Sequence, residues 1–560
     1  MNRIVVMTIF CIAVLAACGE RAGDERGTDA VSTDGRIAVD VLLHNGKIAT
    51  IDAQLGIASA VAIAGNAFVA VGGEELLEGY RATETVDLDG RLVVPGFIDS
   101  HTHLRGQPQR HIDLTKTRSI EQLKEQVRAK IAEMGTGEWI TGYGWSEDFM
   151  AELRRPLRAD LDDAAPENPV LLTRAGGHSA VANSMALELA GIDLDTPQPE
   201  SGVIEVGDDG ELNGVIRERQ DIVGRLIPDA TPAEVRDSLI GVLREQLTFG
   251  ITTFVHATGS IEAYAEWDSI YAAHRGSLPR AVVQVFWEGP DAMRAFGKRS
   301  GDGDEHLRVG PIKIFVDGGF TGPAAYTKEP YRGETEYRGK LSLTVEELQR
   351  IVREAHVAGW QLGIHAIGDA AIELTVDELA ATLDEMPRVD HRHYLNHFTV
   401  MPSPETMTKM AEYGIAISQQ PNFTYTLEGR YREYLGGERL RHNNPLRTPM
   451  SHGVHVAISS DILPIGPMVG IYAAVTRKGM SGEVHGPEEA LSVMEAIRAY
   501  TLFAAFLTFD DHRLGSIEPG KLADLVVLDR DILTTDPAEI LDTQVEQTWL
   551  GGRLVYERAD

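Results

Sequence analysis

Two histidines, His101 and His103, have a single residue between them and follow an apolar segment, 91–98, that is typical of a short buried strand. Residues two apart on a strand point to the same side, so both imidazoles can face one point beyond the strand's end. Nitrogen ligands at this spacing suit a divalent metal ion. Taken alone, such a pair is more often two unrelated loop histidines. The metal interpretation therefore depends on further residues of the same kind.

Four more side chains with metal chemistry each come at the end of an apolar segment: Lys313, His365, His397 and Asp461. An ammonium within the apolar run around Lys313 is costly unless it is neutralised. Each residue also has a structural interpretation: a lysine that extends to solvent or pairs with Asp317, core histidines, and an aspartate that caps a helix. Together they favour a metal centre in which Asp461 is the general base.

The middle of the chain must position these residues, and it alternates strand-like segments with amphipathic helical ones. Such alternation implies parallel strands with helical crossovers. A (β/α)₈ barrel of the TIM type fits the count, and it would gather the strand-end side chains at one mouth. An open doubly wound sheet is the alternative, although no G-x-G-x-x-G phosphate turn marks it. The expected strands are 169–173, 252–256, 281–286, 312–316, 361–365, 394–397, 415–418 and 455–459, and the helices include 120–134, 231–249, 344–358, 371–383, 404–413 and 491–506.

Short strands with turn signals occur at both ends of the chain and predict one small β-sandwich domain built from both termini. Asn45-Gly46 and Gly65-Asn66 separate apolar runs in the manner of hairpins. The same pattern of short apolar runs separated by turn residues recurs over 525–556. We therefore expect sandwich parts at 37–94 and 511–560, with the barrel at 95–510.

Bulk composition excludes one class of partner. The 560 residues carry a formal net charge of −32, and 43% are apolar, which leaves ample core for more than one domain. Without a basic patch, the acidic balance argues against nucleic acid. The expected partner is a small-molecule substrate, and a homo-oligomer is possible.

The first residues are typical of a bacterial lipoprotein signal peptide at 1–17. Arg3 is followed by an apolar stretch that ends Leu-Ala-Ala before Cys18. An ordinary secretory signal is the alternative. Cleavage would leave Cys18 acylated and would discard Cys11, so neither a disulfide nor a thiolate ligand remains. We expect a flexible tether at 18–36 and a lipid-anchored protein of the bacterial cell envelope, mainly periplasmic, that meets the membrane only through Cys18.

The order H-x-H, Lys, His, His, Asp resembles the amidohydrolase superfamily of metal-dependent hydrolases. Locally it is closest to the amidohydrolase-3 branch, which includes N-substituted formamide deformylases. The resemblance covers nearly all of the chain after the tether, and the matching stretches are 95–103, 139–145, 177–187, 365–369 and 514–524. Asn396 departs from the glutamate of many relatives, and Ala257 departs from their aspartate.

The resemblance implies a ligand set of His101, His103, Lys313, His365, His397 and Asp461. It further implies one or two divalent ions, with Zn²⁺ as the default and Mn²⁺ or Fe²⁺ as alternatives, and a CO₂-derived carbamate on Lys313.

The expected function is a metal-dependent hydrolase that uses metal-bound hydroxide to cleave a non-peptide C–N bond of an amide, formamide or cyclic amide. Asp461 would take the proton from water and return it to the leaving nitrogen. His178, in a Gly-rich loop, would donate to the substrate carbonyl; a structural turn histidine is the alternative. The aromatic residues Trp145, Phe320, Tyr326 and Tyr425 are candidate pocket walls.

Other functions remain open at this stage. A deaminase or a lactone or ester hydrolase would use the same residues with a different pocket. A non-catalytic metal- or solute-binding lipoprotein is the alternative from a different class.

Overall fold

A computed structural model describes residues 35–147, 150–175, 177, 179–199, 202–320, 322–462 and 464–559. The leader at 1–17, the lipidation candidate Cys18 and the candidate catalytic His178 lie outside the described residues. Among the described residues, none of the helices has the length and apolar character needed to cross a membrane.

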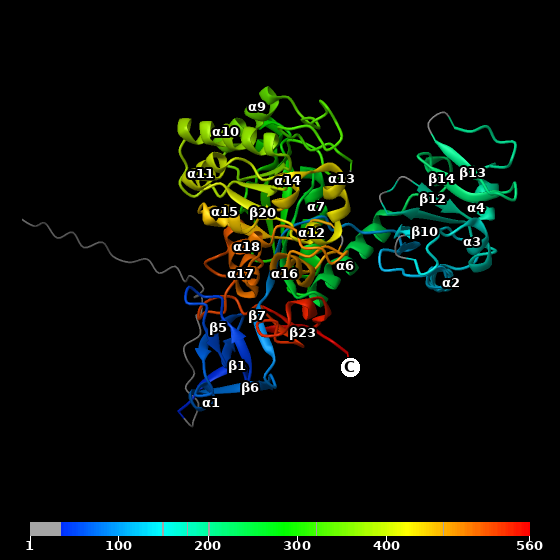
Figure 1. The fold of residues 1–560 in the computed structure, drawn as a ribbon. Coiled ribbons are helices and arrows are strands. Elements are labelled where there is room, and N and C mark those ends of the chain that lie inside the picture. Colours follow the sequence, from blue (N-terminus) through cyan, green and yellow to red (C-terminus); the bar gives the residue numbers. More distant parts are fainter. Residues whose placement is uncertain are drawn as a thin grey trace, which may run out of the picture.

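Eight parallel strands form a barrel at the centre of the molecule (Figure 1), which confirms the predicted fold. The first and last strands meet where Thr102 forms a parallel bridge with Asp461. At the same place the His103 N–H donates to the Asp461 carbonyl at 3.0 Å. In spatial order the strands are β8 (Phe97–Thr102), β15 (Ile251–His256), β16 (Arg280–Phe286), β17 (Leu307–Phe315), β18 (Leu362–Ala366), β19 (Tyr394–His397), β20 (Ala416–Gln419) and β21 (Val456–Ile458).

Amphipathic helices cover the outside of the barrel and pack on its strands. Thr231 begins one of them with a capping box to Glu234, and Thr344 begins another with a capping box to Glu347. The predicted helix over 491–506 is divided in two. The main covering helices are α6 (Pro232–Thr248), α7 (Ile261–Ala273), α8 (Pro290–Phe296), α9 (Val345–Val357), α10 (Asp369–Glu385), α11 (Pro404–Tyr413), α15 (Arg447–Ser451), α16 (Pro467–Thr476), α17 (Val493–Ala499) and α18 (Leu502–Leu507), and three short helices follow β20: α12 (Asn422–Thr426), α13 (Glu428–Tyr434) and α14 (Gly437–Arg441).

A β-sandwich built from both termini lies below the barrel in Figure 1 and confirms that part of the predicted fold. Gly65-Asn66 forms the predicted hairpin turn, but Asn45-Gly46 joins strands of two different sheets. Asn45 takes the left-handed conformation, with φ 54°, that this corner requires. One sheet has β5 (Ala67–Gly72), β4 (Ala60–Ala64), β1 (Ile37–His44) and β6 (Tyr80–Asp87), and the other has β24 (Arg553–Glu557), β23 (Val545–Leu550), β22 (Leu525–Leu528), β7 (Leu92–Pro95), β2 (Lys47–Ala49) and β3 (Ile57–Ala58).

Between β8 and β15 the chain forms a separate α/β unit, here called the insertion, on the far right of Figure 1. Its two apolar cores are drawn entirely from residues 112–227. The predicted helix over 120–134 and strand over 169–173 belong to this unit and not to the barrel wall. The elements are β9 (His111–Asp113), β10 (Ile140–Trp145), β11 (Val170–Arg174), β12 (Ser179–Ala182), β13 (Val203–Val206), β14 (Leu212–Arg217), α2 (Ile120–Met134), α3 (Arg158–Ala164), α4 (Ser184–Leu189) and α5 (Asp221–Gly224).

Candidate metal centre

All six candidate ligands reach the same mouth of the barrel, at the carboxyl ends of its strands. His101 and His103 come from the end of β8, and Lys313 comes from β17. The remaining three are placed by the following strands: His365 lies on β18, His397 ends β19, and Asp461 follows β21. The barrel thus brings together side chains that are far apart in sequence.

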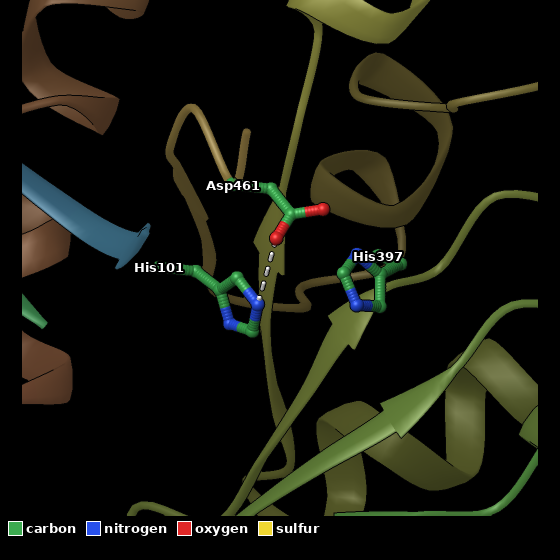
Figure 2. Close-up of side chains that lie close together, drawn as sticks. All are labelled: His101, His397 and Asp461. Carbon is green, nitrogen blue, oxygen red and sulfur yellow. Dashed lines mark ion pairs between the residues drawn. The ribbon is translucent and has the colours of Figure 1, made fainter. Parts of the chain in front are cut away.

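A carboxylate oxygen lies at the middle of this cluster. Oδ1 of Asp461 is 3.3 Å from Nε2 of His101 and 3.2 Å from Nε2 of His103. Nζ of Lys313 is 3.5 Å from the same His101 nitrogen. Figure 2 shows His101, His397 and Asp461 facing a common point, and one possible ligand atom from each lies within 4.8 Å of the others.

The imidazole rings form a continuous group around that point. The ring centroid of His397 is 4.9 Å from that of His101 and 4.4 Å from that of His365. The centroids of His101 and His103 are 5.3 Å apart. The histidines predicted as ligands therefore belong to one cluster.

Oxygen atoms outside the cluster orient three of these rings. Nδ1 of His101 lies 2.6 Å from Oδ1 of Asn396, and Nδ1 of His397 lies 2.8 Å from Oε1 of Gln420. An amide oxygen only accepts, so each Nδ1 carries the proton and donates it. The lone pair of Nε2 is then directed at the cluster, which is the tautomer that binds a metal.

His103 is held in the same way by a hydroxyl. Oγ1 of Thr258 donates to the Ala257 carbonyl at 2.8 Å and lies 3.2 Å from Nδ1 of His103. With its proton committed to the carbonyl, the hydroxyl accepts from Nδ1. Sequence reasoning missed Thr258 and Gln420, and it noted Asn396 only as a departure from relatives, because the contacts join distant segments.

This donor set fits a divalent cation. Two imidazole lone pairs face one carboxylate oxygen at distances where acceptors repel unless a positive charge lies between them. Nε2 of His365 is buried without a hydrogen-bond partner, an arrangement that is costly unless another group completes it. Burial, together with the adjacent Lys313, lowers the pKa of His101 and of His365 to about 3. Both rings are therefore neutral near pH 7, as metal ligands must be.

The backbone at the mouth is strained at two candidate ligands. His397 has φ 79° and Asp461 has φ 58°, in the left-handed region that side chains other than glycine rarely adopt. Such conformations persist where surrounding contacts impose them, and they are concentrated at functional sites.

Asp317 is a further residue of the site, which the sequence indicated only as a possible partner of Lys313. Its carboxylate accepts backbone N–H groups of Tyr326 at 2.9 Å, Ile367 at 3.0 Å and Gly368 at 2.9 Å. Burial raises the pKa of Asp317 to about 7, although those hydrogen bonds oppose the rise. Asp317 thus ties together the loops that follow β17 and β18.

Two of the four aromatic residues named from sequence as pocket walls are buried, whereas Tyr326 and Tyr425 are half-buried. Trp145 is buried inside the insertion, where its Nε1–H donates to the Leu172 carbonyl at 3.0 Å. Phe320 is buried against other aromatic rings, and Tyr425 packs on Tyr472. Burial, which the sequence does not reveal, excludes Trp145 and Phe320 from a pocket wall.

The barrel and its histidine, lysine and aspartate cluster define a metal-dependent hydrolase. A solved structure supports this class: a metal-dependent hydrolase from Pyrococcus horikoshii OT3 superposes with a TM-score of 0.67 at 25% sequence identity. The match covers 89% of this chain and 99% of the Pyrococcus chain. Residues 84–556 match the model of the amidohydrolase family, so the chain belongs to that family.

Two relatives extend along most of the chain. YtcJ of Bacillus subtilis (strain 168) is 31% identical over 507 residues, which cover 87% of this chain and 93% of YtcJ. An N-substituted formamide deformylase of Arthrobacter pascens is 29% identical over 545 residues, which cover 93% of this chain and 98% of the deformylase. The chain is therefore an amidohydrolase acting on carbon–nitrogen bonds other than peptide bonds.

Proposed function

We propose that this enzyme hydrolyses an amide, formamide or cyclic amide at the cluster of His101, His103, Lys313, His365, His397 and Asp461. The observation that carries the proposal is the convergence of imidazole lone pairs on the Asp461 carboxylate. Beside it lies the buried Nε2 of His365, which has no hydrogen-bond partner and is 3.6 Å from Oδ1 of Asp317. One or two divalent ions, with zinc as the best fit to nitrogen and oxygen ligands, would polarise the carbonyl and acidify a water there.

Asp461 is the acid–base residue in this proposal. Burial alone would raise the pKa of Asp461, but a divalent ion held between this carboxylate and the imidazoles would lower it. The carboxylate is therefore ionised at neutral pH and is able to take a proton from the attacking water. It then returns that proton to the leaving nitrogen.

Lys313 is proposed to carry a carbamate. Burial lowers the pKa of Lys313 to about 7, although Asp461 acts in the opposite direction. A substantial fraction of the amine is then neutral near pH 7, and a neutral amine is the form that adds CO₂. The product would be an anionic oxygen ligand in place of a buried ammonium. Mass spectrometry of the intact protein in bicarbonate, with Lys313→Arg as control, tests this: no added mass of CO₂ on the parent chain would contradict it.

Substitution of Asp461 tests the acid–base assignment. We expect Asp461→Asn to lower kcat by about 10²- to 10⁴-fold on any substrate found, because it removes the proton acceptor. Metal content of metal-loaded protein, measured by elemental analysis, should stay close to that of the parent, because asparagine keeps an oxygen ligand and the other five proposed ligands are unchanged. The matched control is Asp390→Asn, which replaces an exposed carboxylate before β19, at the other end of the barrel.

The substrate is to be found with a hydrolysis screen of N-formyl amines, N-acyl amino acids, cyclic amides and lactones using metal-loaded enzyme. Full activity in Asp461→Asn would refute the proposed role of the carboxylate. Turnover confined to lactones would refute the proposed bond.

Localisation is proposed from the leader sequence alone. The Leu-Ala-Ala-Cys18 box supports lipidation of Cys18 and attachment to the cell envelope. Expression in a bacterial host followed by membrane fractionation tests this. Cys18→Ala should shift the protein from the membrane fraction to the soluble one, and an unchanged distribution would contradict lipid anchoring.

A further inference from the structure

Phe315 is an exposed aromatic ring beside the metal centre. It is the last residue of β17 and lies two residues after Lys313, so both side chains point to the same side of the strand. Lys313 is only 2% exposed, whereas Phe315 is 39% exposed. The strand thus carries its ligand candidate inside the barrel and its phenyl ring at the open mouth.

The ring contacts the cluster directly. Its centroid lies 5.3 Å from that of His365, and Nζ of Lys313 is 4.8 Å from it. A substrate whose reacting carbonyl sits at the cluster therefore has its remaining atoms within reach of Phe315.

A second ring extends the surface along the mouth. Phe286 ends β16, the neighbouring parallel strand, and stands opposite Lys313 in the register. The centroids of Phe286 and Phe315 are 6.3 Å apart, and the two ring planes are inclined by 42°. We call these two residues the aromatic wall.

Two carboxylates near the wall are engaged elsewhere. The Asp317 carboxylate accepts three backbone N–H groups behind His365, and Glu354 on the outer helix α9 accepts from Trp287. The two phenyl rings themselves offer a ligand an apolar surface. Covering an exposed phenyl ring removes apolar area from water, and aromatic partners gain further from edge-to-face or offset contact.

We propose that the aromatic wall binds an apolar substituent of the amide substrate, with aromatic rings preferred. This inference rests on the proposed function, since it assigns the non-reacting part of the substrate hydrolysed at the same site. It predicts selectivity for amides that carry a phenyl ring close to the scissile bond.

Matched substrates test the proposal. Metal-loaded enzyme is assayed on N-formyl and N-acetyl derivatives of methylamine, cyclohexylmethylamine and phenylmethylamine. We expect kcat/KM to rise at least tenfold from the methyl to the phenylmethyl compound, mainly through KM. The cyclohexylmethyl compound should lie between them, because aromatic contact adds roughly 2- to 10-fold beyond area burial.

Variants assign the effect to the wall. Phe315→Ala should lower the phenylmethyl-to-methyl ratio of kcat/KM at least fivefold, and Phe315→Leu should give a ratio between those of the parent and of Phe315→Ala. Leu554→Ala, which removes an apolar side chain of similar exposure (40%) from the sandwich, should leave the ratio unchanged. Since Phe315 contacts His365, metal content is measured for each variant. If Phe315→Ala loses metal, the same measurement on Phe286→Ala tests the wall in its place, and a lower phenylmethyl-to-methyl ratio is expected there.

The outcomes separate this inference from the proposed function. Hydrolysis of these amides with no preference for the ring, or a preference that survives both wall variants, overturns the wall alone. Failure to hydrolyse any amide in this set or in the wider screen overturns the proposed function and the wall with it.

Discussion

At the scale of single residues, the site depends on acceptors that hold three of its four imidazoles in one tautomer. Asn396 is separated from His101 by 295 positions in the chain, yet its Oδ1 lies 2.6 Å from the ring. The sequence identifies metal-type residues because strand ends mark them. It does not identify their acceptors, because an asparagine or a glutamine on a strand has no distinguishing pattern. Only the closed barrel reveals these contacts.

Asn396 provides a direct test of ring orientation. Asn396→Leu removes the acceptor at similar volume, so the His101 ring can rotate and its Nδ1–H is left unpartnered. Loss of such a supporting hydrogen bond typically weakens metal binding by about 10- to 100-fold. Competition with a chelator, followed by elemental analysis, should show that loss. Asn396→Asp keeps an acceptor oxygen and should bind metal as the parent does; equal affinity in all three proteins would contradict the orienting role.

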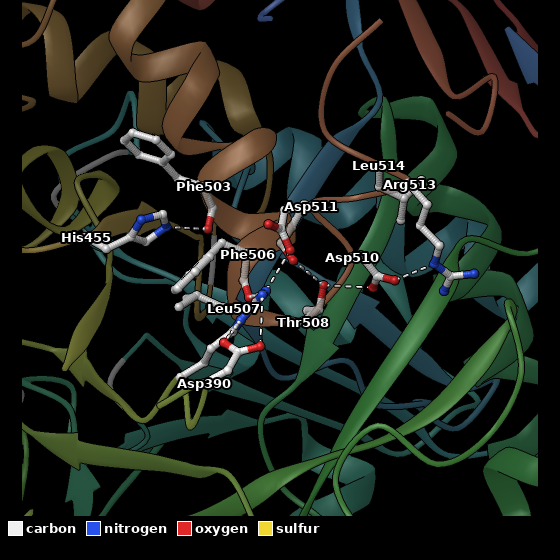
Figure 3. A network of polar contacts seen from close by, with 12 residues as sticks. Asp390, His455, Phe503, Phe506, Leu507, Thr508, Asp510, Asp511, Arg513 and Leu514 are labelled. Atoms are coloured by element: carbon white, nitrogen blue, oxygen red, sulfur yellow. Dashed lines mark hydrogen bonds and ion pairs between the residues drawn. The ribbon is translucent and has the colours of Figure 1, made fainter. Parts of the chain in front are cut away.

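At the scale of elements, side chains that precede barrel strands complete the end of helix α18. The last carbonyls of a helix lack partners within it. His455 before β21 donates through Nε2 to the Phe503 carbonyl at 2.9 Å (Figure 3). Arg392 before β19 donates to the Phe506 carbonyl at 2.7 Å. Gln361 before β18 donates to the Leu507 carbonyl at 2.9 Å. The helix is thereby fixed across the amino-terminal end of the barrel.

The His455 contact predicts a pH effect on stability. Burial lowers the pKa of His455 to about 4. Among its neighbours, the Phe503 carbonyl and Asp511 act to raise this pKa, and Arg392 and Arg498 act to lower it. The unfolded chain binds a proton near pH 6.5 and the folded chain only near pH 4, so this residue's stabilising contribution is lost as the pH falls through that window. The full difference corresponds to about 3 kcal/mol.

His455→Gln separates this effect from that of other buried histidines. Glutamine can donate to the Phe503 carbonyl but does not titrate. The free energy of unfolding, measured by urea titration, should therefore fall less steeply in the variant than in the parent between pH 6.5 and 4. Parallel curves for the two proteins would contradict the assignment.

At the scale of the whole molecule, sequence periodicity predicted the barrel and the sandwich but did not separate the insertion. The helix over 120–134 and the strand Val170–Arg174 have the same apolar spacing as barrel elements. Periodicity reports which face of an element is buried, but not which core buries it. The strand-end residues could be predicted because chemistry and a polar position coincide there. The insertion could not be, because its two cores become evident only when the contacts are known.

Separate cores predict separate responses to substitution. Leu172 on β11 and Leu362 on β18 are both fully buried, the first in the insertion core and the second in the barrel core. Replacing either with alanine should destabilise its own unit by about 2–5 kcal/mol. Differential scanning calorimetry should resolve the transitions. Leu172→Ala should lower one of them and leave the barrel transition and the metal content unchanged, whereas Leu362→Ala should lower the barrel transition together with metal retention. A single transition that shifts equally in both variants would mean that insertion and barrel unfold as one cooperative unit.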